Sequence, residues 1–283
     1  MRIIYTFLLL FLSFYGYSQL KTPSASTASE IQQVVGLTEI VVDYNRPSKK
    51  GREIFGNLVP YGKMWRTGAN SGTEISFSTD VSINDTNIKE GTYSIFSIPN
   101  KDRWEIIFYS DINLWSVPRS WDESKVIFKS NFKSNIFNNS DIVETFSISF
   151  QDITNNNFDL VFSWDDTYVI VPIDVPTRVL VDNQIELIMG DNPKSSDYYS
   201  AAVYYLQEKI KLDIALEWMN KAIDMIENPR FFQLRQYSLI LASNEKYREA
   251  IKVARKSLEL SIQANNQDYV KMNNDSISEW SKK

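Results

Sequence analysis

The sequence of 283 residues contains neither histidine nor cysteine. A Ser-His-Asp triad, a thiolate nucleophile, a histidine-ligated zinc and a histidine-held haem are therefore all excluded. Acid–base catalysis would have to rest on carboxylates, lysine or tyrosine. Without cysteine there is no disulfide and no lipid-modified cysteine, so the stability of the chain must come from its hydrophobic core.

The sequence also lacks a phosphate-binding glycine loop and the residue spacing of a calcium loop. Residues 155–157, with Asp152 and Asp159, offer oxygen atoms that would suit calcium, but a plain turn explains these residues better. We therefore predict no cofactor and no metal. The formal net charge is -5, and a mildly acidic chain is not typical of nucleic-acid-binding proteins.

The first residues have the pattern of a signal peptide. Arg2 supplies a positive charge, residues 3–15 are almost all apolar, and Gly16 and Ser18 are small residues ahead of Gln19. The apolar run is shorter than the about 20 residues that a spanning helix needs. We expect residues 1–18 to be removed and the protein to be exported, periplasmic or extracellular, with no transmembrane segment after cleavage.

Residues 19–176 have the alternation of β-strands. Phe146, Ile148 and Phe150 alternate with polar residues, as in a strand with one wet face. Short polar turns separate the strands, and no helical pattern lies between them, which favours an antiparallel β-sandwich. Further strands are predicted at 38–44, 75–77, 91–98, 104–109, 158–164 and 168–173.

Residues 177–283 change to the period of a helix. Apolar residues from Leu212 to Ile226 recur at three- and four-residue spacings, and the pattern returns from Tyr247 to Ser261, about one tetratricopeptide length later. We predict a tetratricopeptide-like helical tail that offers a groove to a protein or peptide partner. A plain helical bundle is the alternative.

The stretch 46–70 combines cations with aromatic rings. Glycine and proline interrupt it too often for a strand, so residues 51–70 are predicted to form a long ordered loop. Arginine forks suit carboxylate or sulfate, and rings stack on sugars. A turn at 60–62 would bring Arg52 and Arg66 to one side. The candidate residues for an anionic or glycan ligand are Arg46, Lys50, Arg52, Tyr61, Trp65, Arg66, Asn70, Tyr93 and Trp115.

An alternative interpretation of this stretch is structural. Trp65 and Phe55 would close one end of the core, and the arginines would pair with acids. The acids available for such pairs are Asp43, Glu53 and Asp80.

A long series of specific motifs begins in the same region. The motifs are 44–47, 50–52, 54–56, 58–62, 65–70, 73–81, 91–94, 98–99 and Trp104. The series resembles the family catalogued as domain of unknown function 2911, and the resemblance ends near Val175. It implies an exported bacterial protein with a helical repeat tail and no established activity. Asn45 and Ser116 depart from the family pattern, which has serine and glycine there.

Two function hypotheses follow. The first is a non-catalytic binding or assembly module of the bacterial envelope. The second is a carboxylate-dependent hydrolase acting on an envelope glycan, which needs two facing acids about 5 to 9.5 Å apart. The candidate acids are Glu53, Asp80, Glu90 and Glu105. A purely structural role is a third hypothesis, and no residue is predicted to be catalytic.

Overall fold

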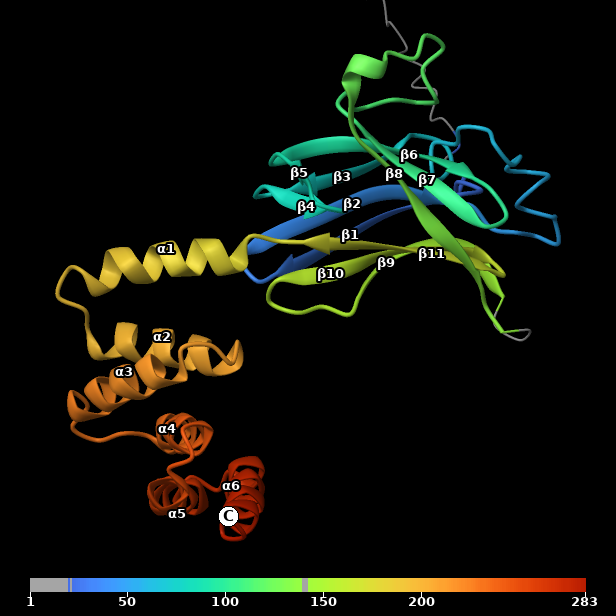
Figure 1. Cartoon of the computed structure of the whole chain (residues 1–283). Coiled ribbons are helices and arrows are strands. Elements are labelled where there is room, and N and C mark those ends of the chain that lie inside the picture. The colour runs from blue at the N-terminus through green and yellow to red at the C-terminus, as the bar shows by residue number, and fades with distance from the viewer. Residues whose placement is uncertain (1–19, 21, 139–141) are drawn as a thin grey trace, which may run out of the picture. The chain divides into compact units, whose positions relative to one another are not determined.

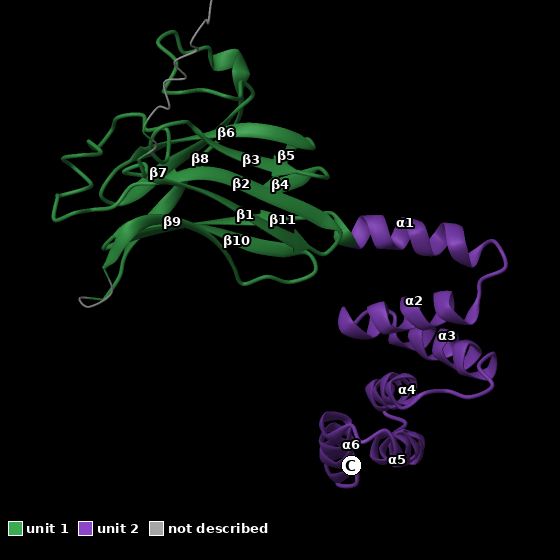
Figure 2. Cartoon of the chain, turned by 180° about the vertical axis from the view of Figure 1, so that it is seen from behind, with its two compact units in different colours: residues 1–177 green, residues 178–283 purple. Residues whose placement is uncertain are grey.

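The structure is a computed structural model that describes residue 20, residues 22–138 and residues 142–283. The predicted signal peptide, 1–18, lies outside the described residues. The chain divides into two units, and the boundary lies between Thr177 and Arg178 (Figure 2). Within the described ranges, no helix combines the length and the apolar character that crossing a membrane requires.

The first unit consists of strands and one short 3-10 helix, η1 (Glu123–Lys125). The strands alternate between buried and exposed side chains, as the period of two predicts. They are β1 (Thr27–Val35), β2 (Thr38–Arg46), β3 (Thr73–Phe77), β4 (Val81–Ile83), β5 (Thr86–Ile88), β6 (Gly91–Pro99), β7 (Arg103–Tyr109), β8 (Val126–Ile136), β9 (Val143–Gln151), β10 (Asn157–Asp165) and β11 (Thr167–Asp174).

The predicted β-sandwich is wrong, because the strands form a nearly closed antiparallel barrel. Nine strands hydrogen-bond in the unbroken order β1-β2-β3-β6-β7-β8-β11-β10-β9, with β4 and β5 as a side hairpin. Strand β8 makes the difference. It pairs with β7 as far as Lys133 and with β11 from Ser134 to Ile136, so it joins what a sandwich would keep as two sheets. Figure 1 shows these strands wrapping around one interior.

The barrel closes through the residues that follow β2. The backbone N–H of Phe146 in β9 donates to Pro47 O at 2.9 Å, and the N–H of Lys49 donates to Glu144 O at 2.7 Å. Inside the barrel, Tyr44 Oη accepts from Ile148 N at 3.1 Å. These bonds pair the end of β2 with β9, so most of the edge that an open sheet would expose is covered.

An aromatic cluster fills the end of the barrel at which this closure lies. Trp65 stacks on Trp164 with ring centroids 5.9 Å apart, and Phe55, Trp104 and Phe146 pack on the pair at tilted or edge-on angles. Trp104 and Trp164 are almost completely buried. Aromatic pairs at these distances stabilise a core beyond the area that they bury.

The second unit is a six-helix region. Its helices are α1 (Thr177–Met189), α2 (Ser195–Gln207), α3 (Leu212–Asp224), α4 (Phe231–Ser243), α5 (Tyr247–Gln263) and α6 (Gln267–Trp280). Helix α2 packs on α3, and α4 packs on α5. The second pair begins about one 34-residue repeat after the first. Five alanines on these helices are buried and let the helices approach closely: Ala202, Ala215, Ala222, Ala250 and Ala254.

Candidate functional site

The segment between the end of β2 at Arg46 and the start of β3 at Thr73 contains no helix or long strand, as predicted. It is nevertheless ordered by hydrogen bonds to the barrel. Trp65 exchanges backbone hydrogen bonds with Ser97 of β6, at 2.8 and 2.9 Å, and the Gly62 N–H donates to Pro99 O at 2.9 Å. The loop is therefore fastened along β6 and presents its side chains in fixed positions.

The turn that carries Arg66 is fixed from both sides. The Trp65 indole N–H donates to Gly68 O at 2.9 Å, and Thr67 Oγ1 donates to Ser97 Oγ at 2.9 Å. Thr67 has a φ of 54° and is completely buried. A side chain on Gly68 would meet Thr73 Oγ1 at 2.9 Å, so only glycine fits this close approach. The backbone of Arg66 thus lies between two anchored residues.

A cavity of about 390 Å³ opens beside this turn. Its size is within the usual range of small-molecule sites, about 300 to 1,000 Å³. Four of the nine predicted ligand-binding residues line it: Lys50, Arg52, Trp65 and Arg66. We call it the cationic cavity.

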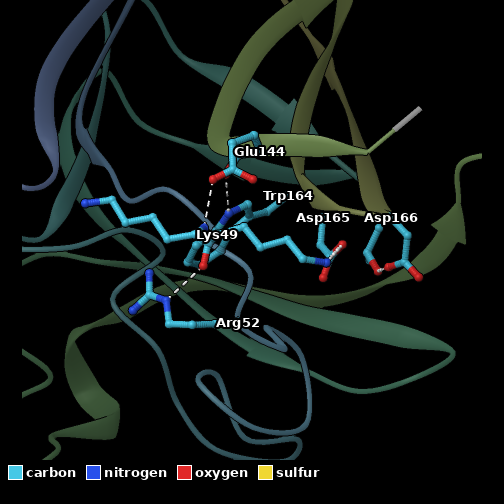
Figure 3. A network of polar contacts seen from close by, with 8 residues as sticks. Lys49, Arg52, Glu144, Trp164, Asp165 and Asp166 are labelled. Atoms are coloured by element: carbon cyan, nitrogen blue, oxygen red, sulfur yellow. Dashed lines mark hydrogen bonds and ion pairs between the residues drawn. The ribbon is translucent and has the colours of Figure 1, made fainter. Parts of the chain in front are cut away.

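A polar network on the neighbouring segment determines which cations face the cationic cavity (Figure 3). Lys49 pairs with Asp165, so its charge is neutralised. The backbone N–H of Lys50 donates to Glu144 Oε1 at 2.7 Å, whereas its ammonium group has no ion pair among the described residues. Arg52 donates from Nε to Lys49 O at 2.9 Å and from Nη2 to Ser48 O, both of them neutral carbonyls. Neither Lys50 nor Arg52 forms an ion pair with a described residue.

Arg66 has the most unusual environment of these cations. Its Nε is buried and has no hydrogen-bond partner in the part of the chain that the structure describes. No carboxylate in the described ranges forms an ion pair with its guanidinium. A buried, unpaired N–H of a charged group costs at least about 1 to 3 kcal/mol. The Arg66 side chain also lines the cationic cavity.

The alternative in which the arginines pair with Asp43, Glu53 or Asp80 is wrong for all three arginines. Arg46 donates from Nε to Phe146 O at 3.0 Å and from Nη2 to Ser147 Oγ at 2.6 Å. It therefore joins β2 to β9 and does not line the cationic cavity. The other half of that alternative is confirmed, because Trp65 and Phe55 lie in the aromatic cluster.

Two further candidates are held by structural contacts. Asn70 Nδ2 donates to Ser26 O at 3.1 Å and to Asn45 Oδ1 at 3.2 Å, which fastens the segment before β1. Tyr93 is 7% exposed and donates from its hydroxyl to Lys89 O at 2.7 Å. Burial and the nearby Asp80 raise the pKa of the Tyr93 phenol. Neither residue lines the cationic cavity.

Tyr61 and Trp115 lie at two other cavities. Tyr61 lines one of about 340 Å³ together with Glu53 and Asp166. Burial, then Asp166 and Glu53, raise the pKa of its phenol. Trp115 is 73% exposed and lines another cavity of about 500 Å³. The structure therefore separates these two rings from Arg52 and Arg66.

The acids proposed for hydrolysis do not gather at one cavity. Glu53 lines the Tyr61 cavity, whereas Asp80 accepts from Lys89 Nζ at 2.7 Å and from the Glu90 N–H at 3.0 Å. Glu105 lies on β7 opposite Ile98. Among the described residues, no group of three or more acids is arranged to hold a metal ion.

Sequence reasoning missed part of the cavity wall. Ser26, Ser48 and Trp164 also line the cationic cavity, and they come from before β1, from after β2 and from the end of β10. No local motif marks them. The barrel closure brings them together, and closure depends on strand order rather than on any single segment.

Comparison with known proteins gives one match. The model of a family described as "Protein of unknown function (DUF2911)" matches residues 26–173, which include the whole loop from Arg46 to Thr73. Searches among curated proteins and among solved structures returned no match.

Proposed function

Because the chain belongs to the DUF2911 family of proteins of unknown function, membership assigns no ligand, and we propose from the site itself that the barrel binds a small anion. The ligand carries a carboxylate or sulfate group that enters the cationic cavity. The observation that carries this proposal is the buried, unpartnered Nε of Arg66 beside Lys50 and Arg52.

The charge balance of the cationic cavity supports an anion. Three cations line it, and none of its described lining residues is an aspartate or glutamate. In a chain with a net charge of -5, such a local excess of positive charge is not a consequence of composition. An arginine fork binds planar carboxylates and sulfates through two hydrogen bonds.

The same lining favours binding over hydrolysis. A glycosidase needs an acid and a second carboxylate on opposite sides of the scissile bond. The described residues that line the cationic cavity include no carboxylate, and the chain contains no histidine. We therefore propose a non-catalytic binding module rather than a hydrolase. Trp65, which is only partly buried, lines the cavity and suits the carbon face of a sugar acid.

The setting in which the module works is part of the proposal. The pattern of residues 1–18 is that of an export signal. At the bacterial envelope, the protein would bind an anionic glycan fragment or a similar small acid. Mass spectrometry of the protein from envelope fractions should give an N-terminus at or near Gln19. An intact Met1 would contradict export by cleavage.

A thermal-shift screen tests the ligand class. The panel contains glucuronate, a sulfated monosaccharide and neutral glucose, all at matched ionic strength so that general salt effects cancel. The acids should raise the melting temperature and glucose should not. Arg66→Lys should fold normally but bind the acids about tenfold more weakly, because an ammonium cannot form the two-pronged contact.

Arg119→Lys provides the matched control, because Arg119 is exposed and lies outside the cationic cavity. It should bind the acids like the wild type. If no acid shifts the melting temperature and Arg66→Ala loses about 3 kcal/mol of stability, Arg66 has a structural role and the proposal is wrong.

A further inference from the structure

The helical unit contains a cavity of its own, of about 430 Å³, which α3, α4 and α5 surround. Helix α4 contributes Leu234, Tyr237 and Leu241, which recur at i, i+3 and i+7 and therefore share one face. Helix α5 contributes residues from Glu249 to Lys256 with similar spacing. Two helix faces thus form facing walls, which we call the lysine cavity.

The floor of the lysine cavity is apolar. Leu216, Leu234 and Leu241 lie at its base and are buried to more than nine tenths. Val253 and the ring of Tyr237 are half-buried beside them. Covering this floor with apolar side chains would be favourable, because it would remove apolar surface from water.

The rim of the lysine cavity carries positive charge. Lys246, Lys252 and Lys256 line it and are exposed, against one acid, Glu249. Lys256 pairs with Glu259 at 2.9 Å. Lys246 and Lys252 form no ion pair with any residue that the structure describes, and Glu249 forms none either. Lys246, Glu249 and Lys252 together therefore leave a net positive charge above an apolar floor.

We propose that the lysine cavity binds an extended acidic peptide segment of a partner protein. The apolar side chains of the peptide lie on the leucine floor, and its carboxylates contact Lys246 and Lys252. The dimensions agree with an extended chain. From Leu234 to Leu241 the floor runs about 10 Å along α4, at 1.5 Å per helical residue, which matches about three residues of strand. Alternate side chains of such a strand point to the floor and to the rim.

Charge complementarity favours a peptide over nucleic acid. Apolar side chains cover a leucine floor, whereas a phosphate backbone would place charge on it. The absence of arginine among the described lining residues also disfavours phosphate.

Selection from a randomised peptide library displayed on phage tests the proposal, with the protein from Gln19 to Lys283 as bait. Selected peptides should be enriched in aspartate and glutamate separated by apolar residues. Synthesised with a fluorescent label, the most frequent peptide should bind about tenfold or more weakly to the double variant Lys246→Glu, Lys252→Glu. Its affinity should also fall as salt rises from 0.05 to 0.5 M, since exposed charges are screened.

A variant with the same change of charge outside the lysine cavity provides the control. Lys271→Glu with Lys282→Glu places two acids on or next to α6 and should leave the affinity within about twofold, because neither residue lines the cavity. Circular dichroism of both variants should match the wild type.

Three results would overturn the proposal. One is a selection that returns no acidic enrichment or no peptide at all. The second is equal loss of affinity in the control variant, because the effect would then come from overall charge. The third is a single-stranded oligonucleotide that binds with the same dependence on Lys246 and Lys252, because it would assign the lysine cavity to nucleic acid.

Discussion

Arg46 and Arg66 lie twenty positions apart, and their guanidinium groups have opposite environments. Arg46 donates to Phe146 O and Ser147 Oγ across the closure of the barrel, whereas Arg66 Nε is buried without an acceptor among the described residues. The first arrangement stabilises the fold without a ligand. The second leaves a buried N–H without an acceptor, which destabilises the fold.

Truncation of Arg46 tests whether its hydrogen bonds to β9 stabilise the closure of the barrel. Arg46→Ala should lower the free energy of unfolding by about 2 to 3 kcal/mol, because it removes two charge-assisted hydrogen bonds that join β2 to β9. Denaturation in urea measures the loss. Arg119→Ala, at an exposed position, should stay within about 0.5 kcal/mol. Equal stability of the two variants would show that Arg46 does not contribute to the closure.

Because of Tyr199, we expect the stability of the helical unit to depend on pH above about pH 10. Burial, followed by the neighbouring Tyr269, raises the pKa of its phenol from 10 to about 12. Below pH 10 the phenol is neutral in both the folded and the unfolded chain. Between pH 10 and 12 the unfolded chain loses the proton first, so the stability of the fold falls through this window.

Melting temperatures recorded from pH 8 to 12 check this prediction. Tyr199→Phe should show a shallower decline above pH 10 than the wild type, because phenylalanine has no proton to lose. Parallel curves for the two proteins would refute the assignment to Tyr199.

The candidate residues could be predicted from the sequence only where they lie near one another along the chain. Lys50, Arg52, Trp65 and Arg66 lie within one loop and line one cavity, as their clustering suggested. Only their aromatic rings make Tyr93 and Trp115 candidates, and the structure places both outside the cationic cavity. Ser26 and Trp164 reach the cationic cavity by tertiary contacts that no motif records.

Among the secondary-structure elements, β8 accounts for the wrong fold prediction. Its sequence, VIFKSNFKSNI, carries Phe128 and Phe132 four residues apart with polar residues between them, so its alternation is weak. Strand β1 also escaped detection, because its outer part is largely exposed. The detected strands satisfy a sandwich and a barrel equally, since both bury one face of each strand. Only the pairing of β8 with both β7 and β11 distinguishes them.

The hairpin between β1 and β2 depends on Gly36. Its φ of 55° suits glycine, and a side chain there would meet Thr177 Oγ1 at 1.8 Å and Asn155 O at 2.2 Å. Gly36→Ala should therefore cost about 3 kcal/mol, from backbone strain and overpacking together. Thermal or urea denaturation measures the change.

Gly51→Ala separates these two causes. Gly51 has a φ of 70°, but no atom lies within 4 Å of the position that a Cβ would take, so only the backbone strain of about 1 to 2 kcal/mol applies. If both alanines cost the same, the close packing at Gly36 contributes nothing to the stability of the hairpin.

From the boundary between Thr177 and Arg178 we predict that the barrel folds without the helices. Thr177 is 3% exposed, and its Oγ1 lies 3.4 Å from the Leu37 N, so it belongs to the barrel although α1 begins there. A fragment of residues 19–177 should give the circular dichroism of β-sheet and a cooperative melting transition.

A fragment that ends at residue 166 is the control. It lacks β11, which pairs with both β8 and β10, so it should not fold. A disordered 19–177 fragment would mean that the helices contribute to the core of the barrel.

Anomalous diffraction from crystals soaked in selenate tests whether an anion occupies the cationic cavity. Selenate has the shape and charge of sulfate, and the anomalous signal locates its selenium atom directly. We expect a peak in the cavity bordered by Lys50, Arg52 and Arg66, with an oxygen about 2.7 to 2.9 Å from a nitrogen of the Arg66 guanidinium. The peak should be absent from Arg66→Ala crystals. Selenate bound at other surface cations while this cavity stays empty would contradict the account.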